Sequence, residues 1–134
     1  MSLYVDSSAL LKRYVEESDS ALADQLLTSD PELVTAAHTE VEVRRNLARL
    51  LDGSDLSRAR EFLATDLESF ALVELDAETC ELAATIAETT LVRTLDALHL
   101  AAAQRVGGGA MAILTFDLRQ AQAARALGLP TVGS

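Results

Sequence analysis

Residues 3–10 read LYVDSSAL, an apolar run that ends in an acid followed by two serines. The run predicts a short strand over Ser2–Val5, with Asp6 directly after it. In open α/β sheets, ligands bind in the crevice outside the carboxyl ends of the strands, so Asp6 is a candidate functional residue. The alternative is that Asp6 only caps the helix that follows, although Ser7 and Ser8 are better placed in the sequence to cap it.

Strands and helices are predicted to alternate along the rest of the chain. The expected strands cover residues 33–35, 70–75, 111–115 and 131–132. The expected helices cover residues 8–17, 20–27, 37–51, 56–68, 77–90, 94–106 and 118–127. Such alternation implies parallel pairing and a sheet that is covered on both faces. The sequence therefore predicts an α/β fold, and its length of 134 residues predicts a single domain, 1–134.

Three more acids recur at comparable junctions: Glu42, Asp96 and Asp117. If they meet Asp6 at one edge of the sheet, four carboxylates repel one another unless cations lie between them. Carboxylate oxygens are the ligands that Mg²⁺ and Mn²⁺ prefer. The pattern therefore indicates a divalent metal site and phosphate chemistry, and Thr115 adds a hydroxyl from the same strand end as Asp117.

Each of these acids also has a structural interpretation. Asp117 is placed to cap the helix that follows it, and Asp96 lies where the helix dipole favours an acid. His99, three residues after Asp96, is more typical of a packed or hydrogen-bonded histidine than of a metal ligand. Glu40 and Glu42 point about 200° apart on one helix, so only one of them faces a given site. The helical wheel does not choose between them.

The composition limits the kinds of partner. The formal net charge is −10, so any contact with nucleic acid must be local rather than spread over a basic face. The densest basic group is Arg44, Arg45 and Arg49, which fits either a solvated helix face or a phosphate contact. A single cysteine, Cys80, excludes an intramolecular disulfide and a cysteine-rich zinc site.

The remaining sequence features favour a cytoplasmic protein. No apolar run approaches the ~20 residues of a membrane span, so no membrane association is expected. No basic region followed by an apolar stretch precedes the first strand, so no signal peptide is expected. Two histidines, His38 and His99, leave little material for a histidine-based metal site.

Taken together, these motifs resemble a PIN domain of the VapC toxin type. The likeness spans essentially the whole chain and rests on four segments. They are YVDSSALLK (4–12), VEVRRNL (41–47), LDALHLA (95–101) and LTFD (114–117) with residues 121–128. In that family the glutamate is followed by arginine three places on and by an apolar residue five places on. Glu42, with Arg45 and Leu47, matches this register better than Glu40.

The resemblance implies a three-layer α/β/α PIN-like fold with a short, mostly parallel central sheet. It implies a metal-dependent endoribonuclease that acts as the toxin of a type II toxin–antitoxin system. The implied catalytic and metal-binding residues are Asp6, Glu42, Asp96 and Asp117, supported by Thr115 and Ser7. The implied cofactor is Mg²⁺ or Mn²⁺, the substrate is RNA, and the partners are a VapB-type antitoxin and a second copy in a homodimer.

Two other functions compete with this one. A catalytically silent PIN-like binding module would lack one or more site acids, and all four are present. A receiver-type signalling domain would need adjacent acids after the first strand and a lysine after a late strand. Lys12 is the one lysine in the chain, which disfavours the receiver interpretation.

Overall fold

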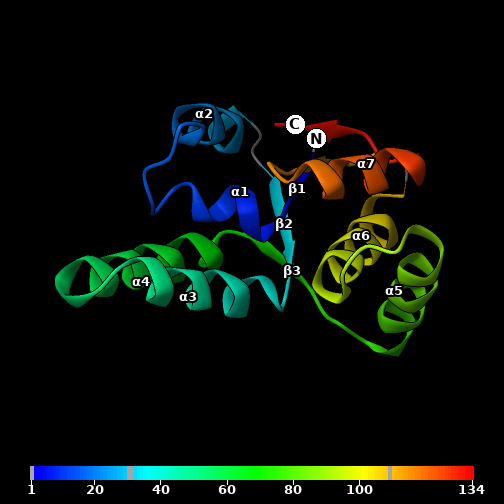
Figure 1. Ribbon diagram of the computed structural model, residues 1–134, viewed down its shortest axis with the longest axis horizontal. Coiled ribbons are helices and arrows are strands. Elements are labelled where there is room, and N and C mark those ends of the chain that lie inside the picture. Colours follow the sequence, from blue (N-terminus) through cyan, green and yellow to red (C-terminus); the bar gives the residue numbers. More distant parts are fainter. Residues whose placement is uncertain (1, 30–31, 109) are drawn as a thin grey trace.

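The computed structural model describes residues 2–29, 32–108 and 110–134. Strands and helices alternate through most of this length, as the sequence predicts (Figure 1). The strands are β1 (Ser2–Val5), β2 (Glu32–Ala36), β3 (Ala71–Val73), β4 (Ala112–Leu114) and β5 (Thr131–Val132). The helices are α1 (Ser7–Leu11), α2 (Ser20–Ser29), α3 (Thr39–Leu50), α4 (Gly53–Glu68), α5 (Ala77–Thr90), α6 (Thr94–Gly107) and α7 (Leu118–Ala126).

The five strands form one parallel sheet in the order β3-β2-β1-β4-β5. The central strand β1 pairs with β2 on one side, with Leu3 opposite Leu33, and with β4 on the other, with Leu3 opposite Ala112. After β1 the chain adds β2 and then β3 on one side, and it later crosses back to add β4 and β5 on the other side. The boundary between β1 and β4 is therefore the point where the strand order reverses, which is where open α/β sheets bind ligands.

Helices cover both faces of the sheet, so the molecule has three layers: helices, sheet and helices (Figure 1). Leu3 and Val5 of β1 pack into a core with apolar residues of α1, α2, α3 and α4. Tyr4, between them, points to the opposite face and packs with α5, α6 and α7. Alternate residues of a strand point to opposite faces, so this short strand supplies both cores. The predicted α/β/α fold is confirmed.

The first predicted helix is much shorter than its expected range of 8–17. Helix α1 ends at Leu11, and the N–H groups of residues 12–14 bond to carbonyls three residues back at 3.0–3.3 Å. The Ser20 hydroxyl then accepts a hydrogen bond from the Glu17 N–H at 2.9 Å and donates to the Val15 carbonyl at 3.3 Å. A side chain thus satisfies backbone groups that a continuing helix would have paired, and the chain turns into α2.

The other bounds differ by a few residues at most. Helix α5 has the predicted limits, whereas α4 begins at Gly53 rather than Leu56. Gly53 has a positive φ of 54°, which a glycine adopts without steric cost. Within the described residues, no helix has the length and apolar character needed to cross a membrane.

Candidate active site

Asp6 occupies the end of β1 and is buried, with 3% of its surface exposed. Its backbone N–H donates to the Leu114 carbonyl at 3.2 Å, which fixes it at the boundary between β1 and β4. Its Oδ1 accepts from the Ala9 N–H at 3.1 Å and from the Ser8 hydroxyl at 2.7 Å. Asp6 is therefore the N-cap of α1, and the expectation that Ser7 or Ser8 caps this helix is wrong. Capping does not remove Asp6 from the site, because the same carboxylate lines a surface pocket.

Asp117 follows β4 and combines the same two roles. Its Oδ1 accepts from the N–H groups of Arg119 at 2.9 Å and Gln120 at 3.3 Å, so it caps α7. The buried Thr115 hydroxyl accepts from the Asp117 N–H at 3.1 Å and lies 3.4 Å from the Ser8 hydroxyl. Thr115 thus joins the loops that carry Asp6 and Asp117, consistent with a supporting role.

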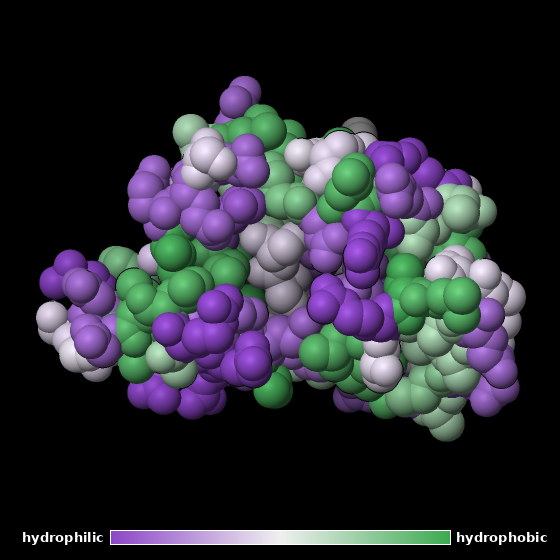
Figure 2. All heavy atoms as spheres, in the orientation of Figure 1, coloured by the Kyte–Doolittle hydropathy of each residue, from purple (hydrophilic) through white to green (hydrophobic). Residues whose placement is uncertain are grey.

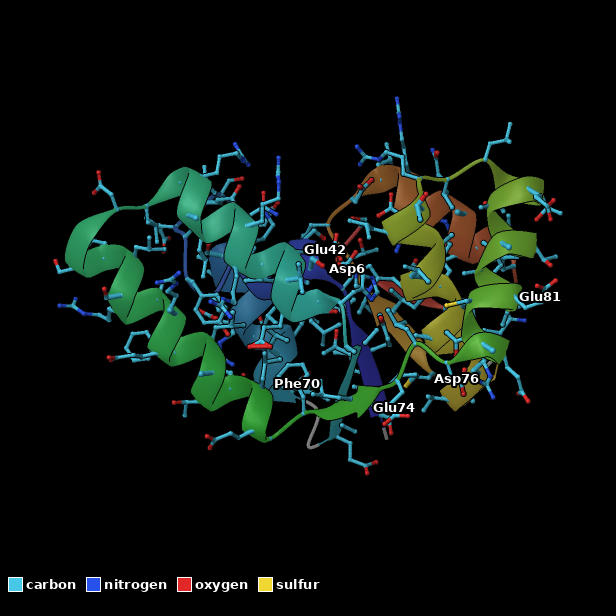
Figure 3. All side chains as sticks on the ribbon, turned by 90° about the horizontal axis from the view of Figure 1, so that it is seen from below. Asp6, Glu42, Phe70, Glu74, Asp76 and Glu81 are labelled. Atoms are coloured by element: carbon cyan, nitrogen blue, oxygen red, sulfur yellow. The ribbon has the colours of Figure 1, made fainter. Side chains whose placement is uncertain are left out.

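The two glutamates of α3 point in different directions, as the helical wheel requires. Glu42 is half-buried, and its Oε1 accepts from the Ser7 hydroxyl at 2.6 Å. Glu40 is exposed and does not line the pocket that Glu42 lines. In Figure 3, Glu42 and Asp6 lie next to each other where the two helical layers meet, whereas Glu74, Asp76 and Glu81 lie apart from them.

Asp96 lies in the first turn of α6. The element directly before α6 is the helix α5, and a short connection joins the two. Asp96 therefore does not follow a strand, and the prediction that it lies at a strand junction is wrong. It reaches the site because α6 packs on the sheet next to Tyr4. Arg93, just before α6, has its guanidinium 3.7 Å from Asp96 and 3.9 Å from Asp117.

The four acids line one pocket of about 210 Å³. It lies at the meeting of α1, α3, α6 and the β4–α7 connection. On the face shown in Figure 2, a group of hydrophilic residues lies just to the right of the paler middle. The lining residues of the pocket are Asp6, Ser7, Ser8, Leu11, Glu42, Asn46, Arg93, Asp96, His99 and Asp117. We call this the carboxylate pocket.

The acids of the carboxylate pocket differ in how readily they ionise. Burial raises the pKa of Asp6, against the opposing positive potential of His99. Burial also raises the pKa of Asp96, and repulsion from Asp117 adds to it. Glu42 is subject to the same effect of burial, but its hydrogen bond to His99 and the charge of that ring hold its pKa below the usual range. A cation in the pocket would relieve the repulsion that acts on Asp96.

Both histidines adjoin Glu42, which the sequence did not indicate. The buried His99 ring places Nε2 2.7 Å from Glu42 Oε1 and Nδ1 2.7 Å from the Tyr4 hydroxyl. His38 Nε2 lies 3.4 Å from the same Glu42 oxygen. With Glu42 ionised, the facing Nε2 of His99 carries a proton and donates it to the carboxylate. The prediction that His99 is hydrogen-bonded agrees with this geometry. The sequence signals that could have placed the histidines at the site are the four-residue spacing of His38 and Glu42 and the three-residue spacing of Asp96 and His99.

The four carboxylates of the carboxylate pocket supply oxygen ligands, which suit a divalent cation such as Mg²⁺. The Arg93 guanidinium places positive charge near Asp96 and Asp117, so a cation at this end of the pocket is electrostatically favoured. Among the described residues, the one group of three whose ligand atoms all lie within 4.8 Å of one another is His38, Glu42 and His99. The three aspartates do not all come within this distance of one another. That spacing is compatible with Mg²⁺, which keeps several waters and binds directly through one or two carboxylates.

His38 should make the stability of the metal-free protein depend on pH. Burial and the nearby His99 lower the pKa of His38 from 6.5 to about 4. Between these values the unfolded chain binds a proton that the folded chain does not, so the free energy of unfolding falls as the pH drops from 6.5 towards 4. We expect a loss of about 2 kcal/mol between neutral pH and about pH 5.

The check is urea denaturation in chelator at both pH values, for the wild type and for His38→Gln. The glutamine amide can still donate to the Leu95 carbonyl, which His38 Nε2 approaches at 3.2 Å, but it does not titrate. The variant should therefore lose less stability on acidification than the wild type. Equal losses would show that His38 does not carry this pH dependence.

The PIN domain family matches residues 3–126. The chain belongs to this family. Among curated proteins, it is 37% identical over 132 residues to Ribonuclease VapC46 of Mycobacterium tuberculosis (strain ATCC 25618 / H37Rv), covering 98% of this chain and 96% of that protein. It is 38% identical over 134 residues to Ribonuclease VapC35 of Mycobacterium tuberculosis (strain CDC 1551 / Oshkosh), covering 97% and 95%. The resemblance to a PIN domain of the VapC type is thereby confirmed.

Solved structures share the PIN fold. VapC20 of Mycobacterium tuberculosis, a sarcin-ricin loop cleaving toxin, aligns with a TM-score of 0.75 at 20% identity, covering 90% of this chain and 94% of that one. FitAcB from Neisseria gonorrhoeae aligns with a TM-score of 0.74 at 19% identity, covering 98% and 96%. At these identities the likeness concerns the fold alone.

Proposed function

We propose that this PIN domain is a metal-dependent endoribonuclease, the toxin of a type II toxin–antitoxin pair. The observation that carries the proposal is the convergence of Asp6, Glu42, Asp96 and Asp117 on one pocket at the strand-order reversal. The curated relatives named Ribonuclease VapC support the choice of RNA as substrate. A silent binding module is less well supported, because the site retains all four acids.

In this proposal Asp6, Asp96 and Asp117 would hold Mg²⁺ or Mn²⁺. Such a cation, when bound, activates water for attack on a phosphodiester and neutralises charge that develops on the phosphoryl oxygens. Ser8 and Thr115 orient Asp6 and Asp117 through their hydroxyls. Ser7 and His99 fix the direction of Glu42 and favour its ionised form, so that Glu42 can accept a hydrogen bond from a ligand or water.

The test is RNA cleavage by the purified protein with and without Mg²⁺ or Mn²⁺. We expect cleavage that stops in excess chelator and returns when the metal is restored, because carboxylates alone repel a phosphodiester. Ca²⁺ serves as a comparison, since it binds oxygen ligands in a looser geometry. Cleavage that persists in chelator would rule out the metal mechanism.

The proposed partners are a VapB-type antitoxin and a second copy of this chain. Solved toxin–antitoxin complexes share the fold, among them one from Klebsiella pneumoniae with a TM-score of 0.68. The contact of Arg93 with Asp96 and Asp117 illustrates how an antitoxin arginine could occupy the same acids. In this proposal, the antitoxin arginine changed to alanine restores cleavage, and light scattering gives a dimer mass for the free toxin.

A further inference from the structure

A second cavity of about 480 Å³ opens beside the carboxylate pocket. It lies between the end of α5, the α5–α6 connection and α7, and we call it the α5–α7 cavity. Its walls include Thr90, Leu91, Arg119 and Ala126, and it shares Arg93 and Asp96 with the carboxylate pocket. The two cavities are therefore neighbours that meet at Arg93 and Asp96, so a ligand bound in one lies next to the other.

The local chain conformation gives Arg93 this position. Leu91 ends α5 in the left-handed region, with a φ of 59°, and its N–H donates to the Ala87 carbonyl at 2.9 Å. Non-glycine residues adopt this conformation uncommonly, and it reverses the chain direction within two residues. Arg93 then precedes α6 with 77% of its side chain exposed. The turn thus presents an exposed guanidinium to both cavities.

The ion pairs of Arg93 are loose. Its distances of 3.7 and 3.9 Å to Asp96 and Asp117 exceed the ~2.7–2.9 Å of a tight charge-assisted hydrogen bond. Exposed pairs of this kind contribute little to stability. The guanidinium can therefore turn towards a phosphate in the α5–α7 cavity at small cost, and guanidinium groups match phosphate oxygens bidentately.

The α5–α7 cavity has the composition of a nucleotide site. Arg93 and Arg119 provide two positive charges against the single carboxylate of Asp96, which matters in a chain with a formal net charge of −10. Thr89, Thr90 and Gln122 provide hydrogen-bonding groups, and Leu91 provides an apolar side chain that is 85% exposed. Unstacked RNA bases bind against apolar or guanidinium surfaces, and cavities of 300–1,000 Å³ are typical of small-ligand sites.

We propose that the α5–α7 cavity binds a nucleotide of single-stranded RNA next to the scissile phosphate. Arg93 and Arg119 contact the phosphates that flank the carboxylate pocket, and the base packs against Leu91. This inference rests on the proposed ribonuclease function and adds the path of the substrate: the strand leaves the carboxylate pocket over Arg93 and runs along α7 towards Ala126.

The first test measures RNA binding by fluorescence anisotropy, with a fluorescein-labelled single-stranded oligoribonucleotide in Mg²⁺. All proteins carry Asp6→Asn to prevent cleavage. Arg119→Ala should raise Kd roughly fivefold, the upper end for an exposed ion pair. It should also reduce the salt dependence of log K by about 0.7, the value for one phosphate contact in a single strand. Arg60→Ala, on α4, makes the same charge change outside both cavities and should leave Kd unchanged.

The second test blocks the cavity without changing charge. Ala126→Phe places an aromatic ring in the α5–α7 cavity at an exposed helix position, and Ala64→Phe makes the same change at an exposed position of α4. Ala126→Phe should weaken oligoribonucleotide binding, and Ala64→Phe should not. Circular dichroism of each variant verifies that the fold is retained.

Failure of this inference can be separated from failure of the proposed function. If the wild type cleaves RNA with Mg²⁺, but Arg119→Ala binds RNA like Arg60→Ala and Ala126→Phe like Ala64→Phe, the α5–α7 cavity does not hold the substrate. Binding of an acidic peptide but not RNA at this cavity would also overturn the inference. If the wild type neither cleaves nor binds RNA, the ribonuclease proposal itself fails.

Discussion

Asp6→Asn is expected to reduce metal-dependent RNA cleavage by at least about a hundredfold. Losing a residue that only hydrogen-bonds to a metal ligand typically costs 10–100-fold in activity, and losing the ligand itself should cost more. The folded protein should remain as stable as the wild type. Asparagine retains the oxygen that accepts from the Ala9 N–H and the Ser8 hydroxyl, and it is as good an N-cap as aspartate. Burial raises the pKa of Asp6, so the charge is costly without a cation and its removal should not destabilise the fold.

Cleavage rates in Mg²⁺ and urea denaturation in chelator measure the two effects separately. Asp6→Ala is the matched comparison, because it removes both the charge and the cap, and the lost cap should cost about 1 kcal/mol. An asparagine variant that cleaves at the wild-type rate would exclude Asp6 from the metal site. An asparagine variant as unstable as the alanine variant would mean that the ionised carboxylate itself is needed for the fold.

Glu42→Gln is expected to lower the cleavage rate by about a hundredfold, whereas Glu40→Gln should leave it within about twofold. Glutamine keeps an oxygen that can accept from the Ser7 hydroxyl and from His99, so the local hydrogen bonds survive while the charge is lost. Glu40 is exposed and lies outside the carboxylate pocket, so its charge has no partner at the reaction centre.

Cleavage by the two glutamine variants, measured side by side with the same RNA and metal, decides between the glutamates. The two variants change the net charge equally, which controls for general electrostatic effects on RNA binding. A larger loss in Glu40→Gln than in Glu42→Gln would refute the assignment of Glu42. Comparable small losses would mean that neither glutamate takes part in the reaction.

Much of the architecture follows from short-range features of the sequence. The alternation of apolar runs with helical patterns predicts the α/β fold, and the limits of α5 agree residue for residue with its predicted range of 77–90. The acids after β1 and β4 were identifiable as site candidates because strand ends in a parallel sheet meet at one edge. These features depend on periodicity and on residues a few positions apart, which a single sequence displays directly.

Other features depended on side-chain contacts that helical periodicity does not show. Helix α1 ends at Leu11, and beyond it the Ser20 hydroxyl bonds the Glu17 N–H and the Val15 carbonyl, three and five positions away. Helical periodicity could not choose between Glu40 and Glu42, since the choice depends on which face of α3 lies towards α6. Asp96 reaches the carboxylate pocket from a helix, so the rule of strand ends could not place it.

The sequence by itself determined the order of the elements, the fold class and the acids that form the candidate site. Only the tertiary structure decided what surrounds those acids. Glu42 meets His99 across 57 positions of sequence, and Tyr4 meets the same ring across 95. The physical reason is that side chains so far apart meet only after α3 and α6 have packed against the sheet, and that packing is set by the summed burial of both cores rather than by any local pattern.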